Sequence, residues 1–270
     1  MPKRAPDSNQ ATEENGRVYQ HGFYDTCDRV RDRASRLEIA HKIEFVLDDI
    51  MNLDTGDMNC LDIGCSSGIV TAAVAHRFAR IIGLDIDQHA LSKLGGSARQ
   101  NAEFVEGDAM LLPFQASSFD AILCLQVYEH VPDDEVLAAE IYRVLKPGGV
   151  VLFSGPNLLF PIEPHYHLPF LHWLPTAWAD LYLRATGKGH SYYENSRSYW
   201  SLRRILSAFT IQDISPDILL YKLLQSVSFE YADDLLKRIT KWLLRATIPL
   251  IPNINWILRK DPQDRAKDDQ

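Results

Sequence analysis

The sequence has few cysteines, and this scarcity argues against a disulfide-stabilised fold. Its 270 residues include only four, at positions 27, 60, 65 and 124. They are scattered along the chain, and Cys60 and Cys65 do not have the C-x-x-C spacing of many redox and zinc sites. We therefore expect small buried thiols in a reducing compartment.

An excess of positive charge and long apolar runs are also lacking. Lysine and arginine total 28 against 36 aspartates and glutamates, which gives a net charge of −8 and an isoelectric point near 5.6. This balance argues against a nucleic-acid partner, because nucleic-acid binding surfaces are usually basic. We see no secretory signal at the N-terminus and no apolar run approaching the ~20 residues that cross a bilayer. We expect a cytoplasmic protein, long enough for one α/β domain with an insertion.

Short apolar runs alternate with helical patterns along the first half of the chain. A helix is predicted over 31–51, where apolar residues recur at helical spacing. Strands are then predicted at 60–63, 80–84, 103–105, 121–125 and 150–153. Helices between them are predicted at 69–78, 88–94 and 133–145, the last closed by Lys-Pro-Gly-Gly at 146–149. This alternation predicts a parallel, doubly wound sheet.

The turn after the first predicted strand is the most informative segment. Its residues, Gly-Cys-Ser-Ser-Gly at 64–68, let the backbone contact a ligand, with a helix N-terminus aimed at it. The spacing is not G-x-G-x-x-G, which disfavours a dinucleotide and an NAD(P) oxidoreductase. An acid, Asp62, stands two residues before the first glycine, and this favours a ligand with no phosphate and an amino-acid-like end. Ligands bind at the carboxyl ends of such strands, where Asp62, Asp85 and Asp108 fall.

The composition predicts five parts in the chain. They are a disordered arm (1–18), the first part of the core (19–157), an inserted cap rich in aromatics and histidine (158–195), the completion of the core (196–260) and a charged tail (261–270). In the fourth part, Ser196 is predicted to cap a helix, and strands are predicted at 210–214 and 254–258. An amphipathic lid helix is predicted at 235–246.

Several segments, taken in order, resemble a known family. They are Leu-Asp-Ile-Gly-Cys (61–65), Gly-Leu-Asp-Ile-Asp (83–87), Glu-Gly-Asp (106–108) with Leu-Pro-Phe (112–114), Ser-Phe-Asp (118–120), Glu-His-Val (129–131) and Leu-Lys-Pro-Gly-Gly (145–149). The ordered set resembles class I S-adenosylmethionine-dependent methyltransferases of the small-molecule branch (methyltransferase type 11-like), strongly over 59–157 and more loosely over 196–209. This resemblance implies a Rossmann-like doubly wound sheet of seven strands with helices on both faces, to which the composition adds the inserted cap. It also implies S-adenosyl-L-methionine as cofactor.

The resemblance also implies roles for two acidic residues. Asp85, at the end of the second strand, is expected to accept hydrogen bonds from both ribose hydroxyls of the cofactor. Its alternative role is to cap the next helix, for which Asp87 is better placed. Asp108 is expected to accept from the adenine amino group, and its alternative is an ordinary turn residue.

The turn itself is expected to hold the methionine portion of the cofactor. Gly64 and Gly68 let the backbone approach, and Asp62 orders the loop and reaches the amino group indirectly. Ser66 replaces a glycine common in the family but is small enough to keep the turn. The full expected cofactor set is Asp62, Gly64, Cys65, Ser66, Gly68, Asp85, Ile86, Asp108, Ala109 and Leu125.

Methyl transfer is an in-line displacement at an activated sulfonium, so it depends mainly on positioning, and a base is needed only for a weakly acidic acceptor. The predicted catalytic residues are His165 and His167, two residues apart in a loop taken as extended, so that both would line one pocket. Ordinary loop packing remains open, and metal ligation together with Glu163 is conceivable, although no metal is predicted. Glu129 and His130 are predicted to shape the pocket wall.

The lid helix and the aromatic cap indicate the class of acceptor. An apolar stripe beside a basic stripe over 235–246 favours a small or lipid-linked, glycan-type acceptor and peripheral contact with the inner face of a membrane. A surface helix docked on the domain explains the same stripes more simply. The alternatives are C- or O-methylation of a quinone or polyketide precursor, and a non-catalytic S-adenosylmethionine-binding protein. The sequence does not indicate an oligomeric state.

Overall fold

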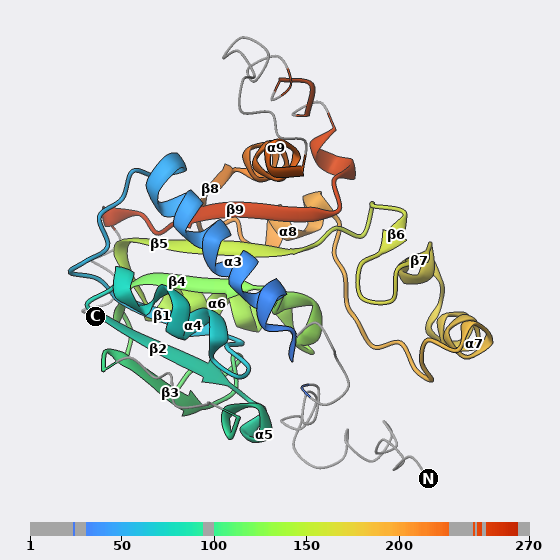
Figure 1. Ribbon diagram of the computed structural model, residues 1–270, viewed down its shortest axis with the longest axis horizontal. Coiled ribbons are helices and arrows are strands. Elements are labelled where there is room, and N and C mark those ends of the chain that lie inside the picture. The colour runs from blue at the N-terminus through green and yellow to red at the C-terminus, as the bar shows by residue number, and fades with distance from the viewer. Residues whose placement is uncertain are drawn as a thin grey trace. The chain divides into compact units, whose positions relative to one another are not determined.

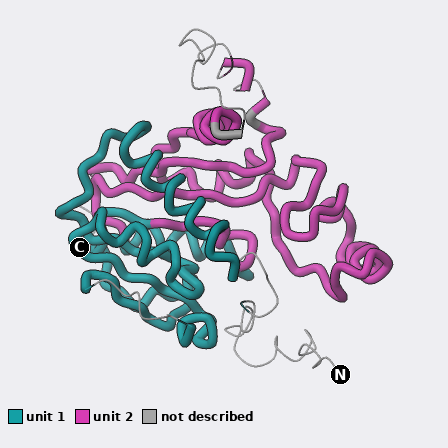
Figure 2. The backbone as a smooth tube through the Cα atoms, in the orientation of Figure 1, with its two compact units in different colours: residues 1–122, 131–144 teal, residues 123–130, 145–270 magenta. Residues whose placement is uncertain are grey.

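The computed structural model describes residue 24 and residues 31–93, 100–226, 240, 242–244 and 247–263. The predicted arm, most of the lid helix and most of the charged tail lie outside the described residues. The chain divides into two compact units, 1–122 with 131–144 and 123–130 with 145–270. Figure 2 shows the first unit in teal and the second in magenta.

The first unit is built around parallel strands, as the sequence predicts. Its strands are β1 (Asn59–Ile63), β2 (Arg80–Asp85), β3 (Ala102–Glu106) and the first half of β4 (Phe119–Leu125). Leu61 pairs with Ile82 and Ile82 with Glu103, so the three strands end at the same edge. Apart from their first residues, β1 and β2 are almost wholly buried, because each is a continuous apolar run that ends in or next to an acid.

The helices of the first unit are α3 (Arg33–Phe45) with a π-helical turn (Val46–Ile50), α4 (Ile69–Val74) with a 3₁₀ turn (Ala75–Arg77), α5 (Gln88–Leu91) and α6 (Asp134–Val144). Helices α3 and α5 begin at aspartate caps, whereas α4 begins at Gly68 without a side-chain cap. Asp32 caps α3 by accepting from Ala34 N and Ser35 N at 3.4 and 3.1 Å. Figure 1 shows α3 and α4 on one face of the strands and α6 on the other, as a doubly wound sheet requires.

The second unit corrects the expectation of an all-parallel sheet. Its main strands are β5 (Leu145–Pro156), β8 (Thr210–Asp213) and β9 (Asn253–Arg259). β9 runs antiparallel to both β5 and β8, with Val151 opposite Leu258 and Ile211 opposite the same leucine. The seven-stranded sheet therefore has the order β3-β2-β1-β4-β5-β9-β8 and is mixed. β5 also begins earlier than predicted, directly after α6.

The second unit also contains short strands, helices and 3₁₀ turns, some of which the sequence pattern did not predict. These further elements are η3 (Tyr128–His130), β6 (Ile162–Glu163), β7 (Leu168–Pro169), η4 (Leu171–Trp173), α7 (Thr176–Thr186), α8 (Tyr199–Ile205), α9 (Ser215–Ser226) and η5 (Ile248–Leu250). Ser198, and not Ser196, caps α8, because its hydroxyl accepts from Ser201 N at 3.2 Å. Helix α9 begins with Ser-Pro, a start signal that periodicity alone did not reveal.

The predicted cap contains its own small core. β6 and β7 form a two-stranded antiparallel sheet, and α7 follows it. A cluster of buried side chains joins these elements: Leu168, Leu171, Ala179, Leu183 and Tyr192. Within the described residues, no helix is long and apolar enough to span a membrane.

Candidate functional site

The turn at 64–68 is fastened to the end of β2. Three of its residues have left-handed backbone, with φ of 73° at Gly64, 55° at Ser66 and 69° at Gly68. Glycine adopts this conformation freely, whereas a serine there is strained by about 1–2 kcal/mol. Gly64 N and Cys65 N both donate to Leu84 O, at 2.8 and 3.1 Å. The turn therefore closes over the carboxyl end of the neighbouring strand.

Asp85 connects that strand end to the turn. One carboxylate oxygen accepts from Ser66 N at 2.7 Å and the other from Asp87 N at 2.9 Å. Burial raises the pKa of Asp85, and these two amide hydrogen bonds oppose the rise. A carboxylate has about four acceptor positions, so it retains capacity for hydroxyl donors. Asp87 caps α5 as expected, accepting from His89 N and Ala90 N at 3.0 and 3.3 Å.

Asp62 is buried beneath the turn. Its Oδ2 accepts from the Thr71 hydroxyl at 2.5 Å, which ties β1 to α4. Burial raises the pKa of Asp62 to about 6, against the lowering effects of the Thr71 hydrogen bond and the charge of Arg36. The Asp62 carboxyl therefore changes its protonation state close to neutral pH, and its pKa responds to any charge brought close to it.

The other predicted cofactor residues occupy varied positions. Asp108 follows β3, and its Oδ1 accepts from Met110 N at 2.8 Å, so it has at least the turn role considered as its alternative. Ala109 is buried and Ile86 is half-buried. Leu125 ends β4, in the second unit, and is half-buried. The cofactor contacts of these residues stay predictions.

Two further residues of this region were missed. The Ser67 hydroxyl is buried and has no hydrogen-bond partner among the described residues, although it belongs to the same turn. Gly83 faces that turn: a Cβ there would lie 2.8 Å from Phe104 and 2.9 Å from Cys65 Sγ. The small-residue turn was a sufficient signal for Ser67, whereas the role of Gly83 depends on tertiary packing.

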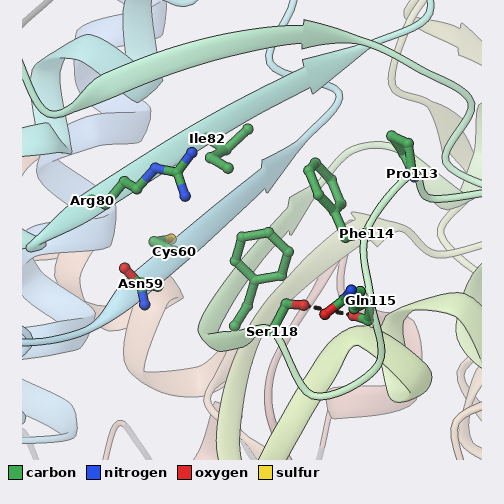
Figure 3. A pocket seen from close by; sticks show the side chains of 9 residues that line it. Asn59, Cys60, Arg80, Ile82, Pro113, Phe114, Gln115 and Ser118 are labelled. Atoms are coloured by element: carbon green, nitrogen blue, oxygen red, sulfur yellow. Dashed lines mark hydrogen bonds between the residues drawn. The ribbon is translucent and has the colours of Figure 1, made fainter.

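The hollow drawn in Figure 3 lies at the opposite edge of the strands. Its volume is about 300 Å³, and Asn59, Arg80 and Phe119, which line it, are the first residues of β1, β2 and β4. Ser118 Oγ donates to Gln115 O across its rim at 2.7 Å. Because ligands of doubly wound sheets bind at the carboxyl ends, this hollow is separate from the turn and Asp85.

In the second unit, His165 and His167 have different surroundings. His165 Nδ1 lies 2.8 Å from Glu163 Oε1, while Glu163 Oε2 accepts from the backbone N–H of His165 and Tyr166. Burial favours the neutral ring, but the Glu163 hydrogen bond and three carboxylate charges raise the pKa of His165 to about 9. His167 is exposed and has a left-handed φ of 53°. The loop is therefore not extended at His167, which corrects the premise that placed both histidines in one pocket. A catalytic role of either histidine stays a prediction.

Glu129 and His130 join His165 in one cluster. The imidazole rings of His130 and His165 meet edge to face, with centroids 5.1 Å apart. His130 Nδ1 lies 2.6 Å from Glu194 Oε2, and Glu129 is fully buried. Burial raises the pKa of Glu129, although the charges of both histidines lower it. Glu194 was missed, since nothing in the local sequence relates it to residues 64 positions earlier.

Comparison with known proteins finds similarity to methyltransferases. Residues 61–153 match the family described as "Methyltransferase domain". The ubiquinone biosynthesis O-methyltransferase of Pseudomonas fluorescens (strain SBW25) is 33% identical over 137 residues, 47% of this chain and 57% of that protein. The demethylmenaquinone methyltransferase of Lactococcus lactis subsp. lactis (strain IL1403) is 36% identical over 131 residues, covering 45% and 52%. The chain thus spans about half the length of the curated relatives it matches.

Solved structures show the same fold at low sequence identity. An S-adenosylmethionine-dependent methyltransferase from Mesorhizobium loti superimposes with a TM-score of 0.56 at 16% identity, covering 80% of this chain and 97% of that one. A phosphoethanolamine N-methyltransferase from Haemonchus contortus has a TM-score of 0.50 at 19% identity, covering 89% and 60%. At such identities the likeness concerns the fold alone.

Proposed function

Because this chain carries a class I S-adenosylmethionine-dependent methyltransferase domain, we propose that the protein transfers a methyl group from S-adenosylmethionine to a small-molecule acceptor. The observation that carries the proposal is the contact of Asp85 with the turn at 64–68. A carboxylate at a strand end, directly hydrogen-bonded to a small-residue turn, offers acceptors for ribose hydroxyls beside a backbone that a ligand can approach.

Each part of the first unit then has a proposed task. Asp85 accepts the ribose hydroxyls, Asp108 accepts the adenine amino group, and the turn holds the methionine end. The buried Ser67 hydroxyl, which has no hydrogen-bond partner among the described residues, supplies a further contact for the ligand. Asp62 supports the turn through Thr71, and its negative charge attracts the cofactor's amino group.

The transfer step needs little chemistry from the protein. A nucleophilic oxygen or carbon of the acceptor forms a bond to the methyl carbon while the sulfur–methyl bond breaks, and neutral adenosylhomocysteine leaves. Positioning of the two reactants contributes up to ~7–11 kcal/mol in well-oriented systems. A hydroxyl acceptor also loses a proton, and we propose that this proton passes to water.

For the acceptor, we propose a partly apolar, lipid-linked molecule methylated on a hydroxyl. The cap exposes several large apolar side chains: Ile162, Phe170, Trp173, Leu174, Trp178 and Leu181. These side chains suit an acceptor delivered from a membrane surface and a peripheral contact there. We place this chemistry in the cytoplasm, where the buried thiols of Cys60, Cys65 and Cys124 stay reduced.

A quinone precursor is the main rival acceptor. It is favoured by the names of two relatives, a ubiquinone biosynthesis O-methyltransferase and a demethylmenaquinone methyltransferase. A labelled-methyl transfer assay with both acceptor classes decides between them. Uptake by lipid-linked glycans supports our proposal, while uptake by quinol precursors alone replaces it.

Calorimetric titration with S-adenosylmethionine and with adenosylhomocysteine tests the cofactor assignment first. We expect both ligands to bind with micromolar affinity. Absence of binding by well-folded protein would refute the assignment. Binding without transfer to any acceptor would support the remaining alternative, a non-catalytic cofactor-binding protein.

A further inference from the structure

Glu129, His130 and His165 form a second candidate site, which the proposed function does not use as such. They reach one point in the second unit from two segments, η3 and the loop after β6. One side-chain ligand atom from each lies within 4.8 Å of the others. We propose that these three side chains bind a divalent metal ion, with Zn²⁺ as the best fit.

The orientation of both imidazole rings is the strongest argument. His130 Nδ1 contacts Glu194 and His165 Nδ1 contacts Glu163, at 2.6 and 2.8 Å. Each ring thereby turns its Nε2 toward Glu129 Oε1, at 3.9 and 4.0 Å. Metal-binding histidines are typically held in this way, with one ring nitrogen on a carboxylate and the other on the metal. Here two such carboxylate–histidine pairs converge on a third carboxylate.

Glu129 is the second argument. Its side chain is 0% exposed, and neither carboxylate oxygen has a hydrogen-bond partner among the described residues. The two histidine nitrogens near it are too distant for hydrogen bonds, which end near 3.2–3.5 Å. A buried carboxylate needs a compensating charge or donors, since its desolvation costs several kcal/mol. A cation bound between Glu129 and the two rings supplies that charge.

The distances suit a metal after a small adjustment. Zn–N and Zn–O bonds of ~2.0–2.2 Å in tetrahedral geometry place ligand atoms ~3.4 Å apart. The observed 3.9 and 4.0 Å therefore close by roughly half an ångström, and the third pair, one nitrogen from each imidazole, closes from a separation within 4.8 Å. Two histidines and one glutamate are a known zinc set that leaves a fourth position open. Three carboxylates against two imidazoles also give the cluster a net negative charge whenever the rings are neutral.

The surroundings hold these ligands firmly. Glu163 is buried and fixed by the N–H groups of His165 and Tyr166, at 2.8 and 2.6 Å. The carbonyl of Glu129 accepts from Asn195 N at 2.8 Å. Gly155 packs so closely that a Cβ there would lie 2.2 Å from the Tyr128 ring and 3.3 Å from Glu129 Oε2. Such preorganisation favours ligation over rearrangement.

The test is Co²⁺ and Zn²⁺ titration of the full chain after dialysis against a chelator. We expect one ion per chain, with intense visible absorption for Co²⁺ in a tetrahedral site and calorimetric heat for Zn²⁺. Glu129→Gln, nearly the same shape, and His165→Ala should each abolish the cobalt spectrum, and Glu194→Gln should weaken affinity 10–100-fold. His167→Ala, altered on the same loop but exposed, should leave binding intact.

Two outcomes would overturn the proposed metal site. An absent cobalt spectrum in folded wild-type protein would overturn the site, as would binding that Glu129→Gln leaves unchanged. Circular dichroism of each variant checks that it folds. Adenosylhomocysteine binding, measured in parallel, tests the proposed function separately, because the residues proposed to bind the cofactor exclude all three proposed metal ligands.

Discussion

The turn at 64–68 and the cluster around Glu129 are built by opposite means. The turn is made of backbone: two glycines and a serine with positive φ, held by amide hydrogen bonds to Leu84 and Asp85. The cluster is made of side chains, with three carboxylates and two imidazoles from segments 129–130, 163–165 and 194. The first exposes hydrogen-bonding groups to a ligand, while the second buries charges that must compensate one another.

This difference predicts unequal responses to mutation. A backbone-built site tolerates side-chain changes that preserve φ, and it loses affinity when a fixed acceptor is removed. A cluster of buried charges loses stability when any member is removed, because the partners stay buried without compensation. Four experiments test this contrast, from the largest expected effect to the smallest.

Glu163→Ala should give the largest loss of stability. It removes the acceptor of two backbone N–H groups and of the His165 ring, and each buried unsatisfied group costs about 1–3 kcal/mol. We expect about 3 kcal/mol less free energy of unfolding in urea titrations. Glu163→Gln, which keeps one acceptor oxygen, should recover part of the loss. A free energy of unfolding equal to that of wild type would show that the hydrogen bonds of Glu163 do not stabilise the cluster.

Asp85→Ala should instead affect binding. Loss of a charged acceptor for ribose hydroxyls weakens cofactor affinity by ~1.5–3 kcal/mol, measured by calorimetry with adenosylhomocysteine. Glu103→Gln is the matched control, since Glu103 is an acid on β3 that pairs with the exposed Arg80. Equal affinities in Asp85→Ala and wild type would mean that the ribose binds elsewhere.

Cofactor affinity should fall as the pH drops through about 6. Asp62 has a pKa raised by burial to about 6, so below that value the free protein carries it protonated and neutral. A cationic amino group then loses an attracting charge, and affinity for S-adenosylmethionine should fall up to tenfold per pH unit. 5′-Methylthioadenosine, which lacks the amino-acid end, is the control ligand. If both ligands weaken equally between pH 7 and 5, Asp62 does not sense the amino group.

Ser66→Gly should have the smallest effect and the opposite sign. Glycine adopts the left-handed backbone of residue 66 without strain, so thermal unfolding should show a gain of about 1 kcal/mol. Ser67, whose φ is not positive, provides the control: Ser67→Gly should be neutral or destabilising. A destabilised Ser66→Gly would mean that the serine side chain contributes more than its backbone costs.

The contrast between the turn and the cluster also explains which parts of the site could be predicted from the sequence. Asp62, the turn and Asp85 lie within 24 consecutive residues, and strand ends set their spacing, so pattern and resemblance located them and the five leading strands. The strand at 254–258 was also predicted, but not the antiparallel direction of β9, because a buried apolar strand has the same pattern in either direction. The cluster around Glu129 was not predicted, because the contact of His130 with Glu194 depends on folding of the whole cap. The backbone at His167 was not predicted either, because nothing in the sequence marks its positive φ.

The position of β9 in the sheet has a consequence for biosynthesis. β8 ends 40 residues before β9 begins, yet its neighbour in the sheet is β9, which also pairs with β5. A ribosome-bound chain that has not yet released Asn253–Arg259 therefore has β5 and β8 without the strand that joins them. Unpaired strand edges are prone to association with other chains. We expect the second unit to depend on chaperones until β9 emerges, while the strands of the first unit are able to pair much earlier.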